Sequence, residues 1–166
     1  MSGDPQWLAL VWRLPTGSST PRVTIWRSLK RLGAATLTPG AALLPYREEL
    51  LEQLGWLAQE VDEMGGNAWV LPVTELSEIE ELRVRQQVSS DREGEYRELE
   101  KAASELLNRP ELGAPSGREV HALRGRLSRI RGRDHFGATG QRQALVAIER
   151  CVAATNDAAG TRLTGS

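Results

Sequence analysis

The sequence predicts an α+β fold: a ferredoxin-like βαββαβ core followed by a C-terminal helical extension. Short apolar runs alternate with segments of helical period in the order strand–helix–strand–strand–helix–strand over residues 6–74, and only helical periodicity follows. The chain's 166 residues, 40% of them hydrophobic and 26% charged, suffice to bury a core. The predicted domains are therefore a ferredoxin-like α/β sandwich at 6–74, a helical extension packed on the core at 75–155, and a disordered tail at 156–166.

The first predicted strand and helix follow from apolar patterning and capping residues. Gln6 to Leu14 is apolar at odd and even positions alike, which predicts a central strand buried on both faces. Thr20 is typical of a helix N-cap, Pro21 of the first helical position, and Gly33 of a helix end. The residues of this helix expected to face the core repeat at helical spacing: Val23, Trp26 and Leu29.

A hairpin, a second helix and an edge strand complete the predicted core. Two short apolar runs between Ala34 and Pro45 are split by a Thr-Pro-Gly turn at 38–40. Residues 46–64 predict an amphipathic helix ended by two glycines, and 68–73 predict a strand that Pro72 places at the sheet edge. The predicted inward side chains of the second helix are Leu50, Leu54, Leu57 and Val61.

The rest of the chain predicts helices. A capping box at Ser77 and Glu80 opens a charged helical stretch towards Leu107, expected to break near residues 89–90 or 94. A second capping box at Ser116 and Glu119 opens a helix to about residue 133, and after a loop a last helix ends near Thr155.

Charge is segregated along the chain although the net charge is −1. Residues 1–46 have a balance of +4, residues 47–111 of −10, and residues 112–166 of +5. A chain that is basic, then acidic, then basic can fold its ends into one positive face, where an anionic partner would dock. Alternatively, the acidic middle neutralises the basic ends through salt bridges.

The helix predicted at 118–133 carries the densest basic cluster. Its apolar residues form one narrow stripe, and close arginines repel one another, so folding gains nothing from them and phosphate contacts are the natural explanation. The alternative is pairing with the acidic helix at 78–105. The residues expected to bind DNA are Arg124, Arg126, Arg129, Arg131 and Arg133, with Arg27, Lys30 and Arg31 of the first helix.

Catalytic and cofactor motifs are sparse. The single cysteine and the spacing of the two histidines do not suit zinc, and no glycine-rich phosphate loop follows a strand. We therefore expect no cofactor, no metal site and no enzymatic activity. Arg131, Arg133 and His135 lie close enough in sequence to form an oxyanion site, and Trp7 and Trp69 could stack nucleic-acid bases, although tryptophans in strands usually belong to the core.

The expected location is the cytoplasm, without contact to a membrane. No apolar run approaches the roughly 20 residues that span a bilayer, and the first residues lack the basic region of a signal peptide.

Five blocks of sequence resemble the N-terminal domain of ChrB-type chromate-resistance transcriptional regulators. They lie at residues 7–15, 21–34, 54–61, 65–69 and, most specifically, 131–138 (RGRDHFGA), so the resemblance covers roughly residues 6–153. It implies a chromate-responsive regulator of efflux operons, with operator DNA as its partner and chromate as a candidate ligand. Operator recognition usually involves a symmetric dimer, so we expect a homodimer.

Two departures from the relatives bear on function. The resemblance implies that the longer regulators carry a second, C-terminal domain, which these 166 residues do not cover, and we expect a separate protein equivalent to that domain as a candidate partner. Nucleases that share the core fold carry an acid at the end of the first strand, where this chain has Arg13-Leu14-Pro15, so we expect no metal-dependent hydrolysis. The alternative function is a module that binds no DNA but holds a small oxyanion such as chromate, or a partner regulatory protein.

Overall fold

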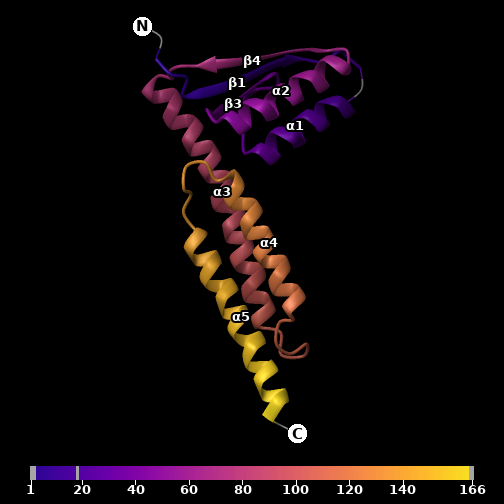
Figure 1. Ribbon diagram of the computed structural model, residues 1–166, viewed down its shortest axis with the longest axis vertical. Helices are drawn as coiled ribbons and strands as arrows, with labels where there is room; N and C mark the ends of the chain where they lie inside the picture. Colours follow the sequence, from indigo (N-terminus) through magenta and orange to yellow (C-terminus); the bar gives the residue numbers. More distant parts are fainter. Residues whose placement is uncertain (1–2, 18, 165–166) are drawn as a thin grey trace. The chain divides into compact units, whose positions relative to one another are not determined.

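The computed structural model describes residues 3–17 and 19–164, which fall into two compact units (Figure 1). The N-terminal unit runs to Val88 and the helical unit begins at Ser89. The division lies inside one long helix, whereas the predicted core ends at residue 74. That residues 75–155 pack on the core stays a prediction.

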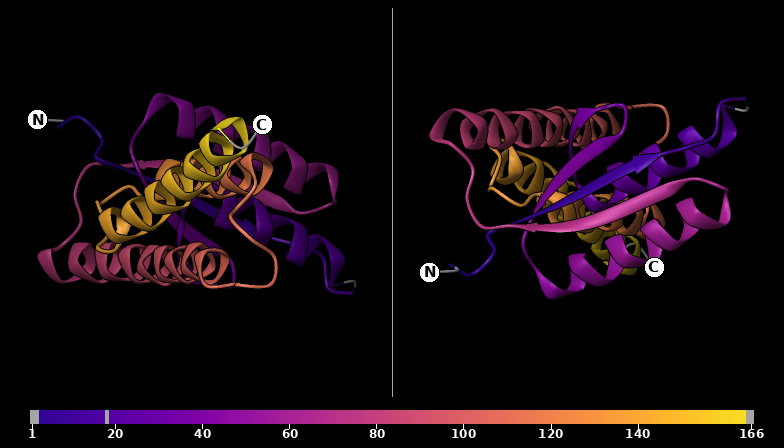
Figure 2. Two further views of the ribbon diagram at one scale, coloured as in Figure 1. Left: turned by 90° about the horizontal axis from the view of Figure 1, so that it is seen from below. Right: turned by 90° about the horizontal axis from the view of Figure 1, so that it is seen from above.

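The N-terminal unit is a four-stranded sheet with two helices on one face (Figure 1; Figure 2, right). Neighbouring strands are antiparallel in the order β2-β3-β1-β4, which confirms the predicted ferredoxin-like core and places Pro72 on the edge strand β4. The elements are β1 (Trp7–Arg13), α1 (Thr20–Leu32), β2 (Ala35–Thr38), β3 (Ala41–Pro45), α2 (Glu48–Glu63) and β4 (Asn67–Val73).

Helix α2 packs in the predicted register. Its inward residues alternate at spacings of four and three, and all of them are buried: Leu50, Leu54, Leu57 and Val61. They form one apolar cluster with the side chains of the sheet that face the helices, among them Leu8 and Leu10 of β1 and Leu44 of β3. The burial of this cluster holds the two layers together.

Helix α1 packs in a different register from the predicted one. Ile25 and Leu29 are buried, whereas Val23 is 41% exposed and Trp26 is 51% exposed. Ile25 and Leu29 are four residues apart and share one helix face, while Trp26 lies about 100° around the axis from Ile25. The N-cap is Ser19 rather than Thr20, and Gly33 ends the helix in the left-handed conformation at φ 75°, as predicted.

Strand β1 is buried on both faces only in its first half. Trp7 lies on the sheet face opposite α1 and α2 and is buried there, with the Arg85 guanidinium 5.9 Å from its ring centroid. Farther along the same face, Val11 is 36% exposed and its cross-strand neighbour Trp69 is 55% exposed. The prediction of a doubly buried strand is therefore wrong for its second half, and Trp69 is not a core residue.

The helical unit contains most of α3 (Glu78–Leu107), all of α4 (Gly117–Arg133) and all of α5 (Gln141–Thr164). Helix α3 is continuous, so the predicted break near 89–90 or 94 is wrong. Each serine or glycine inside a helix costs about 1 kcal/mol or less, which burial of apolar side chains on the same helix outweighs. Helix α5 passes the predicted end near Thr155 and continues to Thr164, so the predicted tail is helical over its described residues.

The core of the helical unit lies between its three helices. Helix α4 contributes the predicted apolar stripe of Val120, Leu123, Leu127 and Ile130, all buried. From α5, Cys151 is completely buried and its thiol donates a hydrogen bond to the carbonyl oxygen of Ala103 at 3.3 Å. Burial raises the pKa of this thiol, so it remains protonated.

The start of α4 is fixed by the predicted capping box and by one further ion pair. The Glu119 backbone N–H donates to the Ser116 hydroxyl at 3.3 Å, and the Ser116 N–H donates to the Glu119 carboxylate at 2.8 Å. Arg109 donates to both oxygens of that carboxylate at 2.6 Å. These hydrogen bonds, first that from Arg109 and then those from Ser116, lower the pKa of Glu119 to about 2.

We expect this carboxylate to make stability depend on pH in acid. Because the pKa of Glu119 falls from 4.5 to about 2 on folding, its contribution is present above about pH 4.5 and is lost as the pH falls towards 2. Glu119→Gln lacks this contribution at every pH. Urea unfolding of both proteins between about pH 5 and 2 should therefore give midpoints that converge in acid. A gap that stays constant would contradict the assignment.

Candidate nucleic-acid interface

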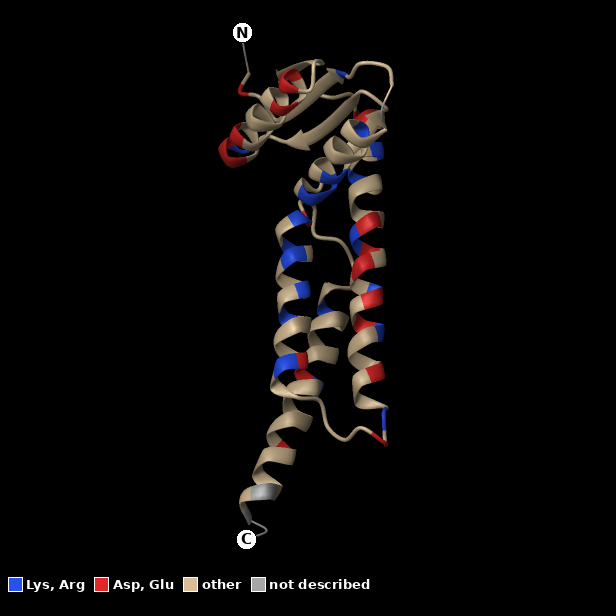
Figure 3. Ribbon diagram, turned by 90° about the vertical axis from the view of Figure 1, so that its right-hand side faces the viewer, with Lys and Arg blue, Asp and Glu red and all other residues tan. Residues whose placement is uncertain are grey.

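The arginines of α4 lie outside its buried stripe, with Arg124 and Arg131 along one side of it and Arg126, Arg129 and Arg133 on another. Arg124, Arg129 and Arg131 are exposed, while Arg126 and Arg133 are half-buried. Figure 3 shows the basic residues following α4 and the acidic ones concentrated on α3 beside it. The repeat of the apolar stripe thus dictates where the positive charges emerge.

Of the five arginines on α4 predicted to bind DNA, Arg133 is paired internally with an acidic residue of α3. Arg133 forms an ion pair with Glu95 at 2.8 Å, and its Nε donates to the Arg129 carbonyl oxygen at 3.2 Å. Glu95 also pairs with the buried Arg92 at 3.2 Å. Within 3–17 and 19–164, no carboxylate lies within 4.0 Å of the guanidinium groups of the other four, Arg124, Arg126, Arg129 and Arg131.

A cleft of about 200 Å³ separates the basic helix from its acidic neighbour. Arg126, Arg129 and Arg133 line it from α4, and Glu95 and Glu98 line it from α3. The two carboxylates lower the positive potential on this side of α4, but among the arginines of α4 that line the cleft only Arg133 pairs with one of them, Glu95. Arg124 and Arg131 do not line this cleft.

The predicted basic residues of α1 have unequal surroundings. Arg27 is exposed and has no ion pair among the described residues. The Lys30 ammonium lies 5.6 Å from the ring centroid of Trp26, and Arg31 donates to the Ser28 hydroxyl at 2.9 Å. That Arg27, Lys30 and Arg31 belong to the same surface as the arginines of α4 stays a prediction.

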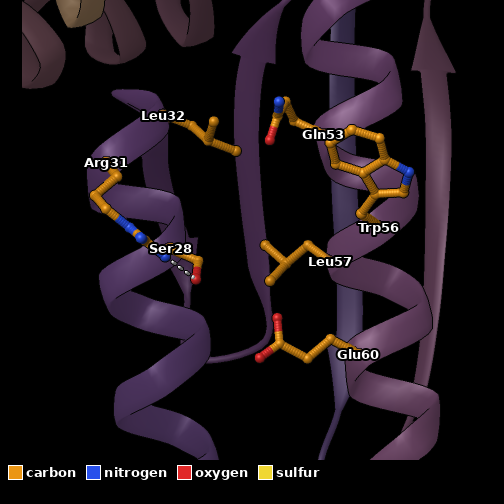
Figure 4. A pocket seen from close by; sticks show the side chains of 7 residues that line it. All are labelled: Ser28, Arg31, Leu32, Gln53, Trp56, Leu57 and Glu60. Carbon is orange, nitrogen blue, oxygen red and sulfur yellow. Dashed lines mark hydrogen bonds between the residues drawn. The ribbon is translucent and has the colours of Figure 1, made fainter.

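Arg31 also lines a groove of about 350 Å³ between α1 and α2 (Figure 4). Glu60 of α2 lies on the opposite side of this groove, and Trp56, which is 58% exposed, lies on the same helix as Glu60. The carboxylate partly offsets the positive charge at this end of α1. Arg27 is therefore the least compensated of the three predicted α1 residues.

The three residues predicted to bind an oxyanion have different surroundings. Arg131 is exposed, Arg133 is held by Glu95, and His135 packs its ring edge-on near Phe136 at 6.3 Å between centroids. An anion at Arg133 would compete with a carboxylate that is already in place. This makes the trio a weaker anion site than its sequence spacing suggests.

Between these residues, Asp134 is a structural centre that the sequence does not reveal. Its carboxylate accepts from the Tyr96 hydroxyl at 2.9 Å and from the Ala138 N–H at 2.9 and 3.1 Å. Tyr96 is completely buried, and burial together with Asp134 raises the pKa of its hydroxyl to about 12. The only sequence signal is that Tyr96 and Leu99 continue the apolar repeat of α3 amid charged residues.

The described residues contain neither a candidate metal cluster nor a candidate membrane span. No three side chains of histidine, cysteine, aspartate or glutamate gather there in a way that could hold a metal ion. None of the helices in that part of the chain has the length and apolar character needed to cross a bilayer.

Comparison with known proteins places the chain in a family. The model of the family described as "Protein ChrB, N-terminal" matches residues 22–108, a range that begins inside α1, includes α3 and ends before α4. Protein ChrB of Cupriavidus metallidurans is 36% identical over 132 residues, covering 74% of this chain and 40% of that protein. No solved structure matches significantly. The chain therefore belongs to the ChrB N-terminal family and spans about two fifths of the curated relative's length.

Proposed function

We propose that this protein is a transcriptional regulator of chromate resistance that binds DNA through α4 and α1. The observation that carries the proposal is a set of four arginines on α4 that have no carboxylate partner among the described residues, although α3 beside them is rich in glutamate. Exposed guanidinium groups of this density are suited to phosphate contacts. Membership of the ChrB family supports the link to chromate resistance.

Binding of this kind is dominated by phosphate contacts and should be steeply salt dependent. Each phosphate neutralised releases counterions, so the slope of log K against log salt falls by about one for each contact removed. Arginine contacts to phosphate set affinity and orientation, while base contacts set sequence preference. We propose a homodimer on a two-fold symmetric operator, as expected for helix-based readers of DNA.

The test is the double variant Arg126→Ala/Arg129→Ala in an electrophoretic shift assay on the DNA upstream of its own gene. We expect affinity at about 0.1 M salt to fall at least tenfold and the salt slope to fall by about two. The matched control is Arg142→Ala/Arg150→Ala, which removes the same charge from α5, where both side chains are exposed. It should leave binding within about threefold of wild type.

Two outcomes would count against the proposal. One is an equal loss in both double variants, since this would show a dependence on net charge rather than on α4. The other is loss of the helical circular dichroism signal in Arg126→Ala/Arg129→Ala with binding spared, because the arginines would then serve folding.

The competing function is an oxyanion or partner-binding module without affinity for DNA. Arg131 favours it, since this residue is exposed and has no ion pair in the described part of the chain. Equilibrium dialysis with chromate, alongside the shift assay with and without chromate, separates the two. Chromate bound by wild type and lost in Arg131→Gln, with no DNA shift at any salt concentration, would favour the module.

A further inference from the structure

A second cavity, of about 290 Å³, lies in the N-terminal unit where α1 crosses the edge of the sheet. Its walls are mainly apolar, from Trp12 of β1, Val23 and Trp26 of α1, and Pro39 of the β2–β3 turn. Only two polar side chains, Arg22 and Thr36, contribute to its lining. Strand β2 is four residues long, so the sheet ends early here and leaves the two indoles facing an open space.

The exposed apolar residues of α1 line this cavity. Val23 and Trp26 are 41% and 51% exposed although both are large and apolar, and the register of α1 turns them towards the cavity rather than the core. Contiguous exposed apolar surface of this kind marks ligand sites more often than it serves folding. Two tryptophans supply flat, polarisable walls suited to an aromatic ring.

The charged groups near the cavity are positive and favour an anionic ligand. All its lining residues come from positions 12–39, a stretch with five basic residues and no carboxylate. Arg22 is exposed, lies in the first turn of α1, and has no ion pair among the residues described. That first turn contains no acidic residue, so the positive end of the helix dipole adds to the charge of Arg22.

We propose that this cavity binds a small aromatic carboxylate of one or two rings, with the ring beside Trp12 and Trp26 and the carboxylate at Arg22. An arginine pairs with a carboxylate in two-pronged geometry. The apolar walls argue against a nucleotide base, because its several polar edge atoms would find only Arg22 and Thr36 as partners and would lose hydrogen bonds to water. A carbocyclic ring has no such atoms. The binding site requires no DNA and stands apart from the proposed function.

Indole-3-acetate is the probe, with the neutral indole-3-acetamide as its control. In ¹H–¹⁵N spectra the five tryptophan side chains report separately. We expect indole-3-acetate to shift the indole signals of Trp12 and Trp26 but not those of Trp56 and Trp69, with a dissociation constant on the order of 1 mM or tighter. The amide should bind about tenfold more weakly.

Matched variants separate charge from stacking. Arg22→Gln should weaken the acid about tenfold and leave the amide unchanged, whereas Arg27→Gln, on the same helix but outside the cavity, should change neither. Trp26→Ala, which removes its own indole signal, should abolish the shift of Trp12 with either ligand, while Trp56→Ala, which alters a similarly exposed indole on α2, should preserve the shifts of Trp12 and Trp26.

Three results would overturn the assignment. They are no shift of either indole at about 10 mM acid, equal affinity for acid and amide, and equal or tighter binding of thymidine monophosphate. Because both tryptophan variants alter exposed side chains, retained circular dichroism would exclude unfolding as the reason for a loss.

Discussion

Replacing Gly66 with alanine should destabilise the N-terminal unit by about 3 kcal/mol. A Cβ atom there would lie 2.4 Å from the carbonyl oxygen of Arg13 and 2.9 Å from Cγ1 of Val61. Both obstacles belong to packed elements, the end of β1 and the last turns of α2, and the Gly66 N–H is already bonded to the Val61 carbonyl at 3.0 Å. The backbone must move, because neither neighbour is the free end of a flexible side chain.

The measurement is urea unfolding followed by tryptophan fluorescence, with Gly55→Ala as the control. Gly55 lies on the exposed side of α2 with open space around the position of a Cβ, so alanine there should raise stability by about 0.5–1 kcal/mol. Opposite signs of the stability change at two glycines eleven residues apart would identify close approach at Gly66 as the cause. A Gly66→Ala protein with the wild-type midpoint would refute the close packing of β1, α2 and β4.

Removing the side chain of Tyr96 should cost the helical unit about 4 kcal/mol. The ring is completely buried among α3, α4 and α5, and its hydroxyl bonds to Asp134 at 2.9 Å, while Gln141 donates to it at 3.4 Å. Tyr96→Ala therefore removes packing and the bond to the carboxylate. Tyr96→Phe removes only the hydroxyl and should cost about 1–2 kcal/mol, since Asp134 keeps the Ala138 N–H.

The hydrogen bond between Tyr96 and Asp134 also predicts that the protein loses stability at alkaline pH. The pKa of Tyr96 rises from 10.0 to about 12 on folding, so the contribution of its neutral hydroxyl is complete below pH 10 and is lost as the pH rises towards 12. Unfolding midpoints of wild type should therefore fall over that window more than those of Tyr96→Phe. Parallel curves would show that the hydroxyl is not held by Asp134.

The helices show what patterning can and cannot predict. In α2 the leucines offer one face only, so their spacing sets the register correctly. In α1, Val23, Ile25, Trp26 and Leu29 offer two overlapping faces, and the predicted face of Val23, Trp26 and Leu29 is wrong because helical spacing alone does not determine which of the two meets the sheet. Helix α3 overrides its internal serines and glycine through tertiary contacts, which no local signal encodes.

The candidate site was predictable in composition but not in pairing. Sequence places the arginines of α4 outside the apolar stripe, because both follow from the helical period. It cannot show that Glu95 pairs with Arg133 and not with its neighbours, or that Tyr96 meets Asp134, since each pair is separated by 38 residues and depends on how α3 meets α4. The cavity beside Trp26 was missed for the same reason as the register of α1.

The buried thiol of Cys151 reports the rate at which the core of the helical unit opens. A protonated thiol without solvent contact reacts with a disulfide reagent only while the surrounding helices are apart. The labelling rate of the unmodified protein thus reports how often that core opens, without a dye or a mutation. Burial also keeps the sulfur of Cys151 away from oxidising anions in solution. A response of the folded protein to such an anion would therefore not begin with oxidation of this thiol.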